Sequence, residues 1–204
     1  PEIKEEIEKS GLKLDNSSKS QSLVAVLFTD INNFTSISEK LKPEEVLKLV
    51  SEYQAKMVAS IFSSNGTVDK FIGDSVMATF GTPSSRGNDA QNAFECARQM
   101  QTAMRQWSKE RSEKSLPEIQ HRIGIHVGNC IVGNIGSDER IEFSVIGDAV
   151  NLAARLEGLT KLYKTPLLLS EETLLKIGDS IFDTRLIDKV AVKGKENHIM
   201  VYEV

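Results

Sequence analysis

The chain has 204 residues, of which 40% are apolar and 26% charged, and its formal net charge is −4. This composition is typical of a folded globular domain and excludes general disorder. The acidic balance argues against nucleic acid as the main partner, because phosphate backbones are bound by strongly basic faces. No apolar run approaches the roughly 18 residues of a membrane-spanning helix. Cys96 and Cys130 lack metal-ligand spacing, which favours free thiols and a cytoplasmic location.

The first 21 residues differ from the rest of the chain. A weak helical stripe of isolated apolar residues is followed by a polar stretch at 15–22. We predict that residues 1–21 form a helix and linker from an upstream module and that residues 22–204 form one domain. Because the chain begins at Pro1, we expect a longer parent protein with an upstream regulatory domain, which could be tethered to a membrane.

Apolar periodicity and turn residues define the expected helices and strands. A continuous apolar, β-branched run after the linker is typical of a strand buried on both faces. Pro43 opens a helix at the favoured first position, and Gly73-Asp74 between two short apolar segments marks a tight hairpin. In chain order we predict a strand at 23–29, a helix from 43 ended by 65–66, hairpin strands at 67–72 and 75–80, a helix from 88 or 89, strands at 121–127, 131–135 and 141–145, helices at 147–159 and 170–177, and a strand at 199–204.

The first 110 residues of this domain have the order strand, helix, strand, strand, helix, strand. That order is the split βαβ arrangement of ferredoxin-like folds. We therefore expect an α+β domain with a ferredoxin-like βαββαβ core, in which an antiparallel sheet carries its helices on one face. The remaining elements form a C-terminal αβ extension.

Two aspartates stand out by their positions. Asp30 directly follows the first predicted strand, and Asp74 lies at the tip of the hairpin. In a split βαβ domain the first strand pairs beside that hairpin, so the two carboxylates can converge. Convergent carboxylates with no adjacent basic residue suit Mg²⁺ or Mn²⁺. The alternative is structural, with Asp30 capping a helix and Asp74 making the turn.

Other residues could bind a phosphate-bearing ligand. The loop Ile31–Thr35 joins a strand to a helix, so its backbone N–H groups would face an anion. Asn151 and Arg155 lie four residues apart on one helix face, and arginine offers a planar cation for phosphate oxygens. A structural hydrogen bond or ion pair is the alternative for that pair. Three lysines could also contact such a ligand or could be ordinary surface charges: Lys70, Lys193 and Lys195.

Five ordered segments resemble the catalytic domain of class III nucleotidyl cyclases over about residues 22–204. They are FTDINNFT (28–35), VDKFIGDSVMATFG (68–81), RIGIHVGNCIVGNIGS (122–137), FSVIGDAVNLAARLE (143–157) and VKGK (192–195). Five motifs in order are far more specific than any one of them. The resemblance favours metal binding over the structural alternative for the two aspartates.

The resemblance implies a role for each matching residue. Asp30, Ile31 and Asp74 match the metal site, which in this family holds two Mg²⁺ or Mn²⁺ ions. Asn151 and Arg155 match the helix pair that positions the ribose and stabilises charge on the phosphates in the transition state. The residues that match phosphate contacts are Asn33, Phe34, Thr35, Lys193 and Lys195.

Lys70 and Ser144 match the positions that read the purine. Lysine donates hydrogen bonds, which suits the acceptor N1 of adenine and not the N1–H of guanine. A serine hydroxyl can accept from the adenine amino group, although adenylyl cyclases more often carry Asp or Thr there. The resemblance thus implies an adenylyl cyclase that converts ATP to 3′,5′-cyclic AMP and pyrophosphate. The ribose 3′-hydroxyl attacks the α-phosphate, assisted by two metal ions.

The family architecture also implies a homodimer with shared sites. Each site takes its metal aspartates from one chain and its purine readers, Asn and Arg from the other, and this chain carries both sets. A guanylyl cyclase is the alternative within the same chemistry, opposed by Lys70. A non-catalytic regulatory module that binds nucleotide is the alternative from another class, opposed by the complete set of motif residues.

Overall fold

The computed structural model describes residues 19–137, 140–178, 184–191 and 198–204. The predicted N-terminal helix, within residues 1–18, lies outside this part of the chain, as do Lys193 and Lys195. No helix of the described part is long and apolar enough to cross a membrane. In chain order the elements are β1 (Lys19–Ile31), α2 (Phe34–Ser38), α3 (Pro43–Ser63), β2 (Thr67–Ile72), β3 (Ser75–Phe80), α4 (Asp89–Glu113), β4 (His121–Ser137), β5 (Arg140–Ile146), α5 (Asp148–Tyr163), β6 (Leu167–Ser170), α6 (Glu171–Ile177), β7 (Arg185–Ala191) and β8 (His198–Glu203).

The sheet contains the predicted ferredoxin-like core. Its strands follow the order β2-β3-β1-β4-β6-β8-β7, and β5 pairs with β4 outside that path. The first four are antiparallel neighbours, which confirms the α+β prediction. The register pairs Phe28 with Met77 and Thr29 with Val76, so the end of β1 lies beside the β2–β3 turn. The extension adds one parallel pairing, between β4 and β6.

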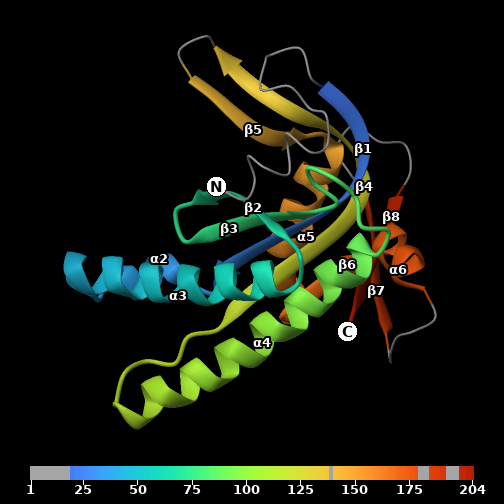
Figure 1. The fold of residues 1–204 in the computed structure, drawn as a ribbon. Helices are drawn as coiled ribbons and strands as arrows, with labels where there is room; N and C mark the ends of the chain where they lie inside the picture. The colour runs from blue at the N-terminus through green and yellow to red at the C-terminus, as the bar shows by residue number, and fades with distance from the viewer. Residues whose placement is uncertain (1–18, 138–139, 179–183, 192–197) are drawn as a thin grey trace.

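The two faces of β1 contribute to two different hydrophobic clusters. Ala25, Leu27 and Ile31 pack with α3 and α4, while Val24 and Phe28 pack with α5. This alternation follows from the two-residue period of a strand. The core helices therefore lie on one face, as predicted, and α5 of the extension covers the opposite face (Figure 1).

Strand β4 is longer than the sequence pattern indicated. We predicted a strand that ends at Gly128-Asn129 and a separate one at 131–135, and this division is wrong. Gly128 and Asn129 continue the ladder because they pair with Val24 and Leu23 of β1. The polar residues 19–22, expected in the linker, extend β1 and pair with residues 130–133.

A glycine in β4 sets how closely α5 approaches the sheet. A Cβ atom on Gly124 would lie 2.2 Å from the Glu157 backbone nitrogen and 2.6 Å from the Ala153 carbonyl oxygen. A strand glycine often marks such a close backbone approach. The absence of a side chain here lets Glu157 reach the polar groups at the start of β4.

Candidate functional site

The structure brings Asp30 and Asp74 together. Asp30 lies at the end of β1, and Asp74 lies in the turn between β2 and β3. The Ile31 backbone N–H donates a 3.2 Å hydrogen bond to Oδ2 of Asp74. Burial, together with the hydrogen bond and negative charge of Asp30, raises the pKa of Asp74 to about 7. Two ionised carboxylates at this position therefore repel each other.

A basic side chain contacts Asp30, although neither aspartate has a basic neighbour in the sequence. Arg122 is directly opposite Asp30 in the β1–β4 register. Its Nη2 lies 2.9 Å from Asp30 Oδ2, and its Nε lies 3.1 Å from Glu157 Oε1. Burial raises the pKa of Glu157 to about 7, with Arg122 opposing and Asp30 adding to the shift. The carboxylates of Asp30 and Glu157 thus flank one guanidinium, and Asp74 adds a third carboxylate beside Asp30, which leaves the site with an excess of negative charge when all three are ionised.

The site fits a divalent cation. Oδ1 of Asp30 is buried and has no hydrogen-bond partner, although buried polar atoms are almost always paired. Within the described part of the chain no group of three or more His, Cys, Asp or Glu side chains could hold a metal. Magnesium, however, is commonly held by one or two carboxylates together with water and substrate phosphates. Asp30 and Asp74 supply that number, and Ile31 could add only its carbonyl oxygen.

The loop after β1 presents backbone donors beside these carboxylates. Asn33 adopts the left-handed conformation (φ 56°) and precedes the short helix α2. The Asn32 N–H donates to the Gln120 carbonyl oxygen at 2.8 Å, which fixes the loop to the segment before β4. The N–H groups in the first turn of a helix have no acceptor within it. Phe34 and Thr35, in that first turn, can therefore offer such donors to an anion.

The two predicted purine readers contact each other. Lys70 Nζ donates a 3.0 Å hydrogen bond to Ser144 Oγ, which joins β2 to β5. The sequence reasoning missed a third member, Asp69. Its side chain is only 3% exposed, lies 3.2 Å from Lys70 Nζ, and accepts from the Ser144 hydroxyl at 3.2 Å. The β2–β3 register shifts between Val68 and Lys70, and such a bulge re-aims side chains so that neighbours can reach one partner.

Asn151 and Arg155 lie on the exposed surface of α5, four residues apart. In the part of the chain that the structure describes, neither forms a hydrogen bond or ion pair with another residue, and nothing joins them to Asp30 or Asp74. We call Asp30, Asp74 and residues 31–35 the carboxylate half-site. The base half-site consists of Lys70, Ser144, Asn151 and Arg155, and α5 begins directly after β5.

Arg122 and Glu157, like Asp69, were missed as site residues. Arg122 opens one of the five quoted segments, and Glu157 closes another, so the motifs contained a signal. The contact of Arg122 with Asp30 depends on a strand register that joins residues 92 positions apart, and Glu157 joins the site through Arg122. A register of this kind cannot be read from local sequence.

Comparison with known proteins places the domain in a family. The family described as adenylate and guanylate cyclase catalytic domain matches residues 16–203. An adenylate cyclase of Anabaena cylindrica is 41% identical over 187 residues, which cover 89% of this chain and 36% of that protein. Adenylate cyclase 1 of Rhizobium meliloti is 35% identical over 181 residues, covering 89% of this chain and 27% of that protein. The chain therefore spans about a third of the length of these curated relatives.

Two solved structures extend the comparison to the fold. The adenylyl cyclase CyaB from P. aeruginosa superposes with a TM-score of 0.83 at 34% identity, covering 91% of this chain and 94% of that one. The guanylyl cyclase Cya2 superposes with a TM-score of 0.80, also at 34% identity, covering 90% and 91%. Because an adenylyl cyclase and a guanylyl cyclase superpose about equally well, fold similarity alone does not distinguish an adenine from a guanine nucleotide as substrate. The chain belongs to the adenylate and guanylate cyclase catalytic domain family.

Proposed function

We propose that this domain is an adenylyl cyclase that converts ATP to 3′,5′-cyclic AMP and pyrophosphate. The observation that carries the choice of base is the cluster of Lys70, Ser144 and Asp69. Lysine has three N–H donors, and contacts with Ser144 and Asp69 use two of them. The Ser144 hydroxyl donates to Asp69 and accepts from Lys70, which leaves one lone pair.

This remaining capacity complements the Watson–Crick edge of adenine. The third N–H of Lys70 can donate to N1, and the free lone pair of Ser144 can accept from the amino group. Guanine presents a donor at N1 and an acceptor at O6, which reverses the pattern. The relatives named adenylate cyclase, at 41% and 35% identity, support the same choice.

The reaction is an intramolecular displacement at the α-phosphorus. The ribose 3′-oxygen forms a bond to phosphorus and loses its proton, and the bond to the bridging oxygen of pyrophosphate breaks. Arg155 would stabilise the charge that develops on the phosphate oxygens, and Asn151 would hold the ribose. The N–H groups of residues 33–35 would bind the polyphosphate. Mg²⁺ or Mn²⁺ bound by Asp30 and Asp74, two ions per site, would supply Lewis acidity that favours the ionised 3′-hydroxyl.

We further propose that two chains form a homodimer whose sites combine half-sites of different chains. The structure joins the two half-sites of one chain by no hydrogen bond or ion pair among its described residues. Large apolar side chains flank the base half-site: Phe71, Ile72 and Ile146 are 49%, 54% and 52% exposed. Exposed apolar groups beside a polar site are typical of an interaction surface. A two-fold dimer would cover them and complete two equivalent sites.

Product formation from ATP and from GTP, each with Mg²⁺ and with Mn²⁺, tests the activity across a range of protein concentrations. We expect cyclic AMP from ATP, with specific activity that rises as the protein is concentrated. Cyclic GMP as the main product would overturn the choice of base. No product under any of these conditions would support the regulatory module instead.

A mixture of two inactive variants tests the shared site. The Asp30→Ala variant has a defective carboxylate half-site, and the Arg155→Ala variant has a defective base half-site. In a mixed dimer one site has both defects and the other has none, so we expect activity to recover on mixing. Absence of recovery, with mixed dimers verified by native mass spectrometry, would contradict the shared arrangement.

A further inference from the structure

Helix α3 contacts both of the segments that carry the proposed metal ligands. The register of β1 with β3 ends at the pair of Thr29 with Val76. Asp30 is the next residue along β1, and Asp74 lies two residues before Val76, so both aspartates lie beyond the last pair of this ladder. Contacts from outside the ladder must therefore set the distance between their carboxylates.

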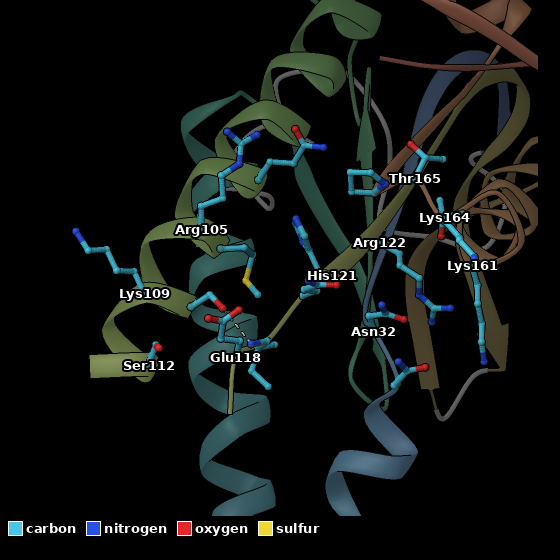
Figure 2. A pocket seen from close by; sticks show the side chains of 18 residues that line it. Asn32, Arg105, Lys109, Ser112, Glu118, His121, Arg122, Lys161, Lys164 and Thr165 are labelled. Atoms are coloured by element: carbon cyan, nitrogen blue, oxygen red, sulfur yellow. Dashed lines mark hydrogen bonds between the residues drawn. The ribbon is translucent and has the colours of Figure 1, made fainter. Parts of the chain in front are cut away.

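The first of these contacts joins α3 to the residue before Asp30. The hydroxyl oxygens of Tyr53 and Thr29 lie 2.8 Å apart, and both residues are 0% exposed. A hydrogen bond in such a buried environment is stronger than one exposed to water. Thr29 Oγ1 also lies 3.3 Å from Nδ1 of His121 at the start of β4, which lines a cavity of about 820 Å³ (Figure 2). Thr29 thus links α3 to the first residue of β4.

The second contact joins α3 to the residue before Asp74. Nε2 of Gln54 donates a 3.1 Å hydrogen bond to the carbonyl oxygen of Gly73. Gly73 has a φ of 63°, a left-handed conformation that glycine adopts readily and that allows a tight turn between β2 and β3. Because Gly73 and Asp74 alone separate the two strands, a bond to one of them constrains the position of the other.

Tyr53 and Gln54 are consecutive residues of one 21-residue helix. Neighbouring side chains of a helix point about 100° apart, so one of them reaches the core while the other reaches the hairpin. A third bond completes the arrangement, because the Ile31 N–H donates to Oδ2 of Asp74 at 3.2 Å. Helix α3, the end of β1 and the β2–β3 turn therefore form a closed ring of contacts, and a shift of one member disturbs the other two.

We propose that Tyr53 and Gln54 are positioning residues that set the separation of the Asp30 and Asp74 carboxylates. Each acts through the residue that precedes one of the aspartates. The inference rests on the proposed metal site, since a cation held by two carboxylates binds most tightly when its ligands are already spaced for it. Loss of either contact would leave both ligands present but less well placed.

Two variants remove these contacts with little change in side-chain size. Gln54→Met lacks the donor to the Gly73 carbonyl oxygen, and Tyr53→Phe lacks the hydroxyl that pairs with Thr29. Tyr53 is fully buried whereas Gln54 is only partly buried, so Gln54→Met tests the proposal even if the other change impairs folding. Circular dichroism melts establish that each variant folds.

Matched controls remove the same groups elsewhere. Gln106→Met loses a 3.0 Å hydrogen bond to Glu110 on the exposed face of α4. Tyr163→Phe loses the hydrogen bond to Asp188, which joins the end of α5 to β7. Neither control alters a contact of the carboxylate half-site.

The first measurement uses the metal-free protein and the second adds Mn²⁺. The Ile31 amide reports the spacing directly, because its hydrogen is donated to Asp74 Oδ2. Its exchange, followed by NMR, should be at least about threefold faster in both variants and unchanged in the controls. Calorimetric titration with Mn²⁺ at about pH 8, above the Asp74 pKa of about 7, should show affinity at least about threefold weaker in both variants.

The Asp74→Ala variant separates failure of this inference from failure of the proposed function. If that change abolishes Mn²⁺ binding, affinities in Gln54→Met and Tyr53→Phe equal to those of the controls would overturn the inference, whatever the melting temperatures. A residue that only stabilises the fold gives that result. If Asp74→Ala binds Mn²⁺ as tightly as the unmodified protein, the metal assignment is wrong. Faster Ile31 exchange would then still support positioning of the carboxylates by α3, and unchanged exchange would overturn it.

Discussion

Replacement of Lys70 by methionine tests the assignment of the base half-site most directly. The change keeps the length of the side chain and removes the donors at 3.0 Å from Ser144 and 3.2 Å from Asp69. A hydrogen bond that involves a charged group contributes about 1.5–3 kcal/mol. If Lys70 donates to adenine N1 in the transition state, kcat/KM for ATP should fall roughly 10- to 150-fold.

The effect on folding should be much smaller. Lys70 is 44% exposed, so its ion pair with Asp69 contributes at most about 1 kcal/mol. Asp69 itself is 3% exposed but retains the two contacts from the Ser144 hydroxyl. A large loss of activity with a small loss of stability therefore separates recognition of the base from damage to the fold.

The assay is chromatographic measurement of cyclic AMP and cyclic GMP over a series of ATP and GTP concentrations. Lys48→Met is the matched control, because Lys48 is 76% exposed on α3 and pairs only with Glu52 among the described residues. Its kinetics should equal those of the unmodified protein. A kcat/KM for ATP within about threefold of the control, with an unchanged preference for ATP over GTP, would refute the reasoning.

Three other changes test the carboxylate half-site and the packing behind it. Asp74→Ala should remove cyclase turnover with both Mg²⁺ and Mn²⁺ and weaken Mn²⁺ binding in titrations; retained activity would contradict the metal assignment. Because the pKa values of Asp74 and Glu157 rise to about 7 on folding, from 3.8 and 4.5, the metal-free folded state binds more protons than the unfolded state between pH 4 and 7. The unfolding free energy of the unmodified protein, measured in urea, should therefore fall as pH rises from 5 to 8 relative to that of the double variant Asp74→Asn, Glu157→Gln. Parallel curves for the two proteins would refute this. Gly124→Ala would place a methyl group 2.2 Å from a backbone nitrogen, so we expect a loss of about 1–3 kcal/mol in urea unfolding, and no loss would show that α5 can shift freely.

Local sequence patterns were sufficient to predict the individual strands and turns that place the two aspartates. The apolar run before Asp30 and the Gly73-Asp74 turn were predicted, and the split βαβ order then brought the two aspartates to one end of the sheet. The length of β4 was not predictable, because Gly128 and Asn129 are typical turn residues. They remain in the strand only because the distant residues Leu23 and Val24 are available as partners.

The same distinction applies to the site. Lys70 and Ser144 were identified from motifs, but the role of Asp69 depends on a bulge that local patterns do not specify. Arg122 reaches Asp30 through strand register, and Glu157 reaches Arg122 only because Gly124 allows α5 to come close. Charge at a site is therefore harder to predict than its ligands, since it depends on several independent packing contacts.

The junction of β2 and β5 has a consequence for how substrate preference can evolve. The contacts that join these strands come from Lys70, Asp69 and Ser144, outside the β1–β4 ladder that holds Asp30 and Arg122. Substitutions at these three positions can alter the hydrogen-bonding pattern presented to a base without changing a core strand. On the proposed assignment, a lineage could exchange one purine for another while the phosphate chemistry stays intact, so that nucleotide preference and catalytic activity would evolve independently.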